Sequence, residues 1–379
     1  MLLHPATIQE LTEFRKTLHQ YPELSGQETE TAKRIETFFD NLNPDKTISG
    51  LGGTGLAFIF QGKDPGPTTL FRCELDGLPI KEENTISHLS TIPNKSHVCG
   101  HDGHMAILSG LGTYFSANTP KKGRIVLLFQ PAEETGEGAE AVIKDPKFIG
   151  IQPDFAFALH NLPGYPLHQV LLKQGAFAAA SVGMSIHFKG RNSHSAHPEA
   201  GNSPAEAMAK TIVALEKLPL GIGKFSLVTV IHAELGSIAF GTTPGTAVVR
   251  ATLRAFENET RDALVTYASQ LATTIANEYG LGVSFEFVES FAATHNDPEA
   301  WKIGLDAAAS LGLDIRHVEK PFRWSEDFGL FSSHTKTLLF GLGSGLDQPQ
   351  LHESNFDFPD ELIETGVRMF AEIANKHHF

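Results

Sequence analysis

Residues 125–134 read Ile-Val-Leu-Leu-Phe-Gln-Pro-Ala-Glu-Glu and contain the clearest strand pattern of the chain. The first half is a continuous apolar run, which is typical of a strand buried on both faces of a sheet. Similar runs occur at 56–60, 68–71 and 155–159, and a helical stretch lies near 105–115. This alternation predicts an α/β domain in which a mixed sheet carries helices on both faces.

The middle of the chain has a different pattern. Val182, Met184, Ile186 and Phe188 alternate with small or polar residues, which indicates a sheet with one open face. Further along, two helix-like and three strand-like segments complete the order β-α-β-β-α-β. That order is typical of a ferredoxin-like α+β unit.

We therefore expect two domains. Residues 1–178 and 290–379 would form the first, and residues 179–289 would be an inserted second domain that acts as a lid. The length of 379 residues agrees with this division, because single hydrophobic cores rarely grow so large. Hinge points would lie near residues 178 and 290.

Charge and composition exclude several classes of partner. The formal net charge is -14 and the pI is about 5.7, and Lys and Arg do not cluster, so neither nucleic acid nor an anionic membrane is an expected partner. No apolar run is long enough to span a bilayer. Only two cysteines occur, Cys73 and Cys99, which suits a reducing compartment and predicts a cytoplasmic protein.

Residues 97–104 read His-Val-Cys-Gly-His-Asp-Gly-His and form the densest cluster of metal-ligating residue types in the chain. Thiol, imidazole and carboxylate groups suit zinc, and manganese, cobalt or nickel where imidazole and carboxylate dominate. The alternative interpretation is a polar turn before a helix, with a buried cysteine beside it. The cluster alone does not separate the two.

Other candidate residues follow strand-like runs. Glu133 and Glu134 come after Phe129, His160 ends the run 155–159, and Asp76 follows the run near 68–71. In open α/β sheets the carboxyl ends of the strands line the functional crevice. We therefore expect these side chains to converge with the cluster at 97–104. One carboxylate of the adjacent pair could bind a cation while the other takes a proton from water.

The sequence resembles the family of metal-dependent aminoacylases and carboxypeptidases that includes hippurate hydrolase, plant auxin-conjugate hydrolases and N-acetyl-diaminopimelate deacetylase. The resemblance runs nearly end to end, and its most specific part is Cys-Gly-His-Asp-Gly-His at 99–104 with the downstream Glu-Glu and His-Asn. The matching segments are 19–24, 53–55, 72–80, 99–104, 131–134, 160–161, 193–194, 325–328 and 351–352.

The resemblance implies a dinuclear site. It implies two divalent cations per subunit, Zn²⁺ or Mn²⁺ with Co²⁺ or Ni²⁺ as alternatives. The general base would be Glu133. The implied metal ligands are Cys99, His101, Glu134, His160 and His352.

The resemblance also implies roles outside the ligand set. Asp76 would orient a ligand or the base, and His194 in the inserted domain would stabilise the oxyanion, from its own subunit or from a partner. Asn202 and Arg254 are candidate contacts for a substrate carboxylate. The resemblance further implies that the inserted domain, residues 179–289, is also a dimerisation domain, so a homodimer or higher homo-oligomer is expected.

The expected activity is hydrolysis of the amide bond of an N-acyl amino acid, with peptidase or carboxypeptidase activity also open. A first alternative is a thiol hydrolase that uses Cys99 as nucleophile, activated by His101 or His104. A second alternative is a metal-stabilised protein that binds acylated amino acids without turnover. Glu133 beside Glu134 speaks against the second alternative.

Overall fold

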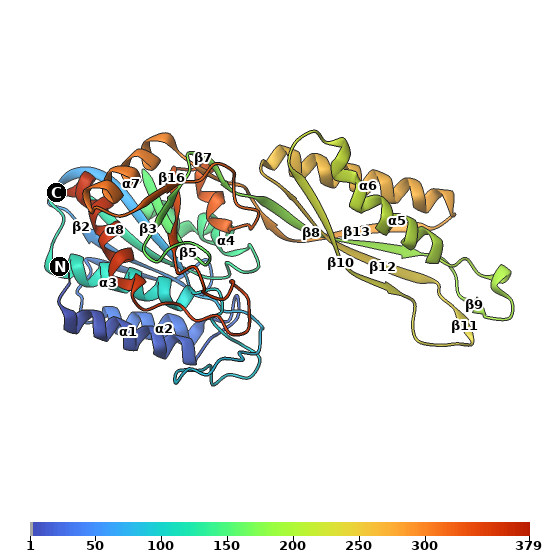
Figure 1. Cartoon of the computed structure of the whole chain (residues 1–379), viewed down its shortest axis with the longest axis horizontal. Helices are drawn as coiled ribbons and strands as arrows, with labels where there is room; N and C mark the ends of the chain where they lie inside the picture. Colours follow the sequence, from blue (N-terminus) through green and yellow to red (C-terminus); the bar gives the residue numbers. More distant parts are fainter. Residues whose placement is uncertain (1–2) are drawn as a thin grey trace. The chain divides into compact units, whose positions relative to one another are not determined.

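The computed structural model describes residues 3–379 and divides into two compact units (Figure 1). Unit 1 comprises Met1–Phe177, Thr294–Lys320 and Glu326–Phe379. Unit 2 comprises Ala178–Ala293 and Pro321–Ser325. The short segment Pro321–Ser325 falls within the first domain of the sequence-based division but packs with unit 2.

Unit 1 is built on an eight-stranded mixed sheet with the strand order β1-β2-β4-β3-β5-β16-β6-β15. Its central strands β4, β3, β5 and β16 are parallel, whereas β1 and β2 are antiparallel to their neighbours. The mixed sheet expected from the apolar runs is therefore confirmed. The strands are β1 (Lys46–Leu51), β2 (Gly55–Gln61), β3 (Asp64–Glu74), β4 (Lys122–Gln130), β5 (Phe155–Leu162), β6 (Val170–Leu172), β15 (Ile315–His317) and β16 (Lys336–Gly343).

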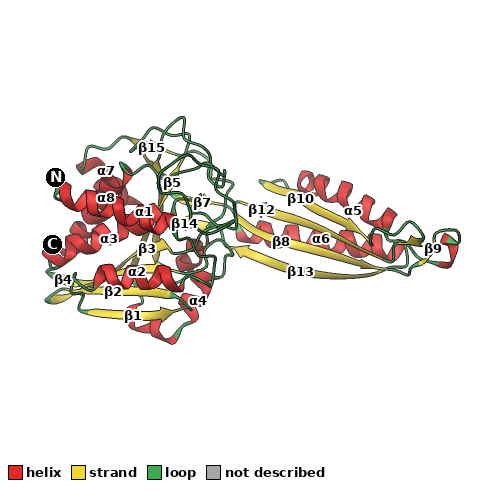
Figure 2. Ribbon diagram, turned by 90° about the horizontal axis from the view of Figure 1, so that it is seen from below, coloured by secondary structure: helices red, strands yellow, loops and turns green. Residues whose placement is uncertain are grey.

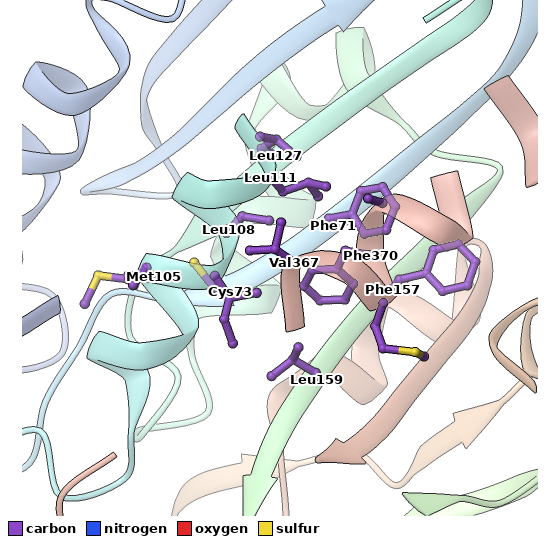
Figure 3. Packing of buried hydrophobic residues seen from close by; sticks show 14 of the residues in the cluster. Phe71, Cys73, Met105, Leu108, Leu111, Leu127, Phe157, Leu159, Val367 and Phe370 are labelled. Carbon is purple, nitrogen blue, oxygen red and sulfur yellow. The ribbon is translucent and has the colours of Figure 1, made fainter. Parts of the chain in front are cut away.

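Both faces of this sheet are covered. In β4, Ile125, Leu127 and Phe129 belong to the main hydrophobic cluster, and the alternate residues Val126 and Leu128 are equally buried outside it. Because successive side chains of a strand point to opposite faces, both faces exclude water. Figure 3 shows part of the main cluster. The helices are α1 (Pro5–Gln20), α2 (Thr29–Phe39), α3 (His101–Ala117), α4 (Gly138–Lys144), α7 (Pro298–Ser310) and α8 (Leu362–His378).

Unit 2 contains a four-stranded antiparallel sheet with the strand order β10-β12-β8-β13. Helices α5 and α6 pack on one face of it, against apolar residues that alternate along β8 and β12 (Figure 2). A small two-stranded sheet pairs β9 with β11. The elements are β8 (Ala180–Lys189), β9 (Ser193–His194), α5 (Ala205–Lys217), β10 (Ser226–Leu235), β11 (Thr242–Thr243), β12 (Thr246–Ala255), α6 (Asn258–Glu278) and β13 (Gly282–Phe291). Within residues 3–379, no helix is long and apolar enough to cross a membrane.

Candidate metal centre

Three neighbouring parallel strands bring the predicted side chains to one edge of the sheet. Strand β3 ends at Glu74 and is soon followed by Asp76, and β4 ends just before the segment that carries Glu133 and Glu134. His160 lies inside β5, because this strand continues to Leu162 rather than ending at the last residue of the apolar run. The carboxyl ends of parallel strands meet at one edge, so these groups converge.

The segment that precedes α3 carries Cys99 and His101 to the same edge. Gly100 adopts a left-handed conformation with a φ of 95°, and α3 begins at the next residue. A Cβ atom at this position would lie 2.5 Å from Oδ1 of Asn161, so only glycine fits. The backbone nitrogen of His352 donates to the carbonyl oxygen of Val98 at 2.9 Å, which brings the C-terminal part of unit 1 against this segment.

Cys99, His101 and His160 form one group of potential metal ligands, in which one donor atom from each residue lies within 4.8 Å of the others. All three side chains are buried. The Nδ1 atom of His160 donates to the carbonyl oxygen of Asn161 at 2.9 Å, and its Nε2 atom lies 3.6 Å from Sγ of Cys99. This hydrogen bond sets the ring so that Nε2 faces the thiol.

The carboxylates complete two further groups of the same kind. Cys99, Glu134 and His352 form one, and His101, Glu133 and Glu134 form the other. Nε2 of His101 lies 3.8 Å from both Glu133 Oε2 and Glu134 Oε1, and Nε2 of His352 lies 3.7 Å from Glu134 Oε2. The structure thus brings together every predicted ligand and the predicted base.

These residues fit a metal ion by chemistry and by spacing. Within the described chain, Nε2 of His101 and Oε1 of Glu134 are buried without a hydrogen-bond partner. Buried polar atoms are rarely left unsatisfied, so two such atoms that face each other indicate a cation. Separations of 3.6 to 3.8 Å are long for hydrogen bonds but match two ligands that are each about 2.0–2.3 Å from a shared ion.

Asp76 hydrogen-bonds to two residues of this group, His101 and Glu134. Its Oδ2 atom accepts hydrogen bonds from Oγ of Ser25 at 2.6 Å and from the backbone nitrogen of Glu134 at 2.9 Å. Its backbone carbonyl accepts from Nδ1 of His101 at 2.8 Å, which directs Nε2 of that ring toward Glu133 and Glu134. Hydrogen bonds of this kind fix the tautomer and orientation of a ligating histidine.

A buried acid cluster beside Glu133 was not predicted. Glu133, Glu326 and Asp327 lie within 4.8 Å of one another, and Arg72 pairs with Glu326 at 2.8 Å and with Asp327 at 2.6 Å. Burial, followed by the nearby charges of Glu326 and Glu134, raises the pKa of Glu133 well above its usual range. Residues 325–328 were recognised in the sequence only as a matching segment, because nothing local shows that they approach residue 133.

Three predicted residues lie in unit 2. Nδ1 of His194, in β9, accepts from the backbone nitrogen of Ala196 at 3.0 Å. Nδ2 of Asn202 donates to two backbone carbonyls, those of residues 279 and 280. Nη1 of Arg254 donates to Oγ of Ser325 at 2.9 Å and to a backbone carbonyl.

Comparisons with known proteins agree with this geometry. The model of "Peptidase family M20/M25/M40" matches residues 70–376. The chain is 27% identical to N-acetylcysteine deacetylase of Bacillus subtilis over 368 residues, which covers 96% of both chains. It is 30% identical to N-acetyldiaminopimelate deacetylase of Lactobacillus helveticus over 374 residues, 95% of this chain and 96% of that one.

Among solved structures, the chain is similar to the YXEP protein of Bacillus subtilis, which is described as a dinuclear metal-binding peptidase from the M20 family. The TM-score is 0.83 with 26% sequence identity, and the alignment covers 98% of each chain. The family match spans most of the sequence and includes the converging residues described above. The resemblance seen in the sequence is thereby confirmed: the chain is a hydrolase of amide bonds and belongs to peptidase family M20/M25/M40.

Proposed function

We propose that this enzyme hydrolyses the amide bond of small N-acyl amino acids and uses two divalent cations, Zn²⁺ or Mn²⁺, to do so. The observation that carries the proposal is the convergence of Cys99, His101, Glu134 and His160, with Glu133 beside them. Within this group, Nε2 of His101 and Oε1 of Glu134 are buried without a hydrogen-bond partner. The names of two relatives, both deacetylases of N-acetylated amino acids, support this substrate class.

The ligands would be Cys99, His101, Glu134, His160 and His352. Bound divalent cations would supply Lewis acidity, which lowers the pKa of water and polarises a carbonyl group. The raised pKa of Glu133 refers to the metal-free protein, and nearby positive charge favours its carboxylate form. Glu133 as a carboxylate is then able to accept a proton.

Glu133 handles the proton in both halves of the reaction. Its carboxylate removes a proton from the attacking water, whose oxygen forms a bond with the carbonyl carbon of the amide. The carbon–nitrogen bond then breaks, and Glu133 transfers the same proton to the leaving nitrogen. The products are a carboxylic acid and a free amino acid, and Glu133 returns to its starting state.

His194 is the proposed donor to the oxyanion. Because Nδ1 accepts a hydrogen bond from Ala196, a neutral ring carries its proton on Nε2, which leaves a donor for the developing negative charge. Arg254 is the proposed contact for the substrate carboxylate, through guanidinium nitrogens other than Nη1. Asn202 is a poorer candidate, since its Nδ2 donor already serves two carbonyls.

The thiol mechanism has less support. Burial, followed by the charge of Glu134, raises the pKa of Cys99 well above its usual range, and His101 only partly opposes this shift. A cysteine nucleophile needs a depressed pKa, because the thiolate is the reactive form. A thiol that sits among imidazoles and carboxylates is better suited to bind a metal ion.

Metal analysis and chelation test the proposal. We expect purified protein to contain two equivalents of divalent metal and to hydrolyse members of a panel of N-acetyl and N-benzoyl amino acids and dipeptides. A strong chelator should abolish activity, and Zn²⁺ or Mn²⁺ should restore it. Activity that survives complete metal removal, with a covalent acyl group on Cys99, would support the thiol hydrolase. Binding of the panel without turnover under every metal would support the non-catalytic protein.

We also propose that the enzyme is a homodimer joined through unit 2. Ile238 and Phe240, in the segment between β10 and β11, are 100% and 98% exposed, and large exposed apolar groups are typical of interaction surfaces. Light scattering should give twice the chain mass. Ile238→Ser with Phe240→Ser should shift the protein to monomer, and a dimer that persists unchanged would exclude this surface.

A further inference from the structure

Arg15 is a fully buried cation at a junction of distant segments in unit 1. From α1, its Nη1 atom donates to Asp102 at 3.2 Å and to Asp357 at 2.6 Å. Its Nε atom donates to Asp360 at 2.9 Å, and Nη2 lies 3.0 Å from Nε2 of His88. Side chains of this type are almost never fully buried unless they are paired. One guanidinium thus joins carboxylates from the start of α3 and from residues 357–360.

Each carboxylate is close in sequence to a proposed metal ligand. Asp102 follows His101 directly, and Asp357 lies in the segment 344–361, which also carries His352. This segment contains no helix or strand. His352 adopts a left-handed φ of 67°, which is unfavourable for a residue other than glycine. The position of His352 therefore depends on its backbone hydrogen bond to Val98 and on side-chain contacts of the segment, rather than on regular structure.

Further hydrogen bonds surround Arg15 and its carboxylate partners. Nδ1 of His19 donates to Oδ2 of Asp102 at 2.8 Å, and its Nε2 donates to Glu82 at 3.0 Å. Burial alone would lower the pKa of His19, but Asp102 and Glu82 raise it to about 9. Gln348 donates to the backbone carbonyl of Asp357, which ties the loop to itself. The junction therefore combines three buried charged groups, those of Arg15, His19 and Asp102, with the partly exposed carboxylates of Asp357 and Asp360.

We propose that Arg15 is a positioning residue for metal binding, which holds the segment carrying His352 against the start of α3. This inference rests on the proposed function, since it takes His352 as a ligand. Holding the ligand in place before the cation arrives lowers the conformational entropy lost on binding. Of the ligand groups described above, His352 joins the one with Cys99 and Glu134, whereas His160 joins the one with Cys99 and His101. Loss of Arg15 should therefore weaken one cation site selectively.

Calorimetric titration of metal-free protein with Zn²⁺, without substrate, tests the inference. Wild type should bind two equivalents. Arg15→Met should weaken one equivalent by about 10-fold and leave the other unchanged. This is the lower end of the effect of losing a hydrogen-bond partner of a ligand, because Arg15 bonds to residues near the ligands rather than to the ligands themselves. Arg15→Lys should recover part of the loss. Arg316→Met, a change at an exposed arginine of unit 1, is the matched control and should bind as wild type does.

Asp357→Asn provides a second variant in case Arg15→Met does not fold. The side chain of Asp357 is 24% exposed, so its replacement should disturb folding less than the loss of buried Arg15 does. Arg15 keeps its pairs with Asp102 and Asp360 in this variant. The same selective loss is expected. If folded Asp357→Asn and Arg15→Lys proteins bind both equivalents with wild-type affinity, Arg15 has no positioning role. Wild-type protein that binds no Zn²⁺ would instead overturn the proposed function itself.

Discussion

Replacing Glu133 with Gln should lower kcat by about 10²- to 10⁴-fold while the protein keeps both metal equivalents. Glutamine preserves the size of the side chain but cannot accept and return a proton. The change leaves all the proposed ligands in place, so metal binding and KM should vary little. Steady-state kinetics on the best substrate of the panel, with metal analysis of the same preparation, measures both quantities.

Glu140→Gln is the matched control for this variant. Glu140 lies in α4, a few residues further along the same segment, where it is exposed and forms an ion pair with Lys144. Surface pairs of this kind contribute about 0.5 kcal/mol or less to stability. The control should keep wild-type kcat. A Glu133→Gln enzyme with wild-type kcat and a full metal content would rule out Glu133 as the general base.

Replacing His101 with Ala should remove metal and activity together. Nε2 of His101 faces Glu133 and Glu134 on one side, and the residue also groups with Cys99 and His160. Its loss deletes a ligand rather than a supporting hydrogen bond, so affinity for metal should fall by more than about 10²-fold. Titration of the metal-free variant with Zn²⁺ measures the loss directly.

His97→Ala is the matched control for His101→Ala, because it removes a neighbouring buried histidine that is not a proposed ligand. His97 lies in the same segment and is equally buried, but it is in none of the potential ligand groups found among residues 3–379, and neither of its ring nitrogens has a hydrogen-bond partner there. The control should keep two equivalents of Zn²⁺. If His101→Ala binds Zn²⁺ as tightly as His97→Ala does, His101 is not a ligand.

The sequence alone determined much of the chemistry. Apolar runs such as 125–129 and 155–159 report local burial, and they predicted the mixed sheet because burial on both faces leaves no polar alternation. The residues at 97–104 predicted a metal site, because thiol, imidazole and carboxylate groups are concentrated there. Sequence similarity then identified the family, because its most specific residues are contiguous.

Only the tertiary structure decided which charged residues surround the predicted ligands and base. Glu326 approaches Glu133, and Arg15 joins Asp102 to Asp357, through contacts between segments far apart in the chain. Periodicity records whether a residue is buried but not what it is buried against. Buried charges find partners by geometry, and a guanidinium pairs equally well with any carboxylate that the fold brings within reach. The positions of these charged groups therefore follow from the packing of the sheet and its helices, which no single segment encodes.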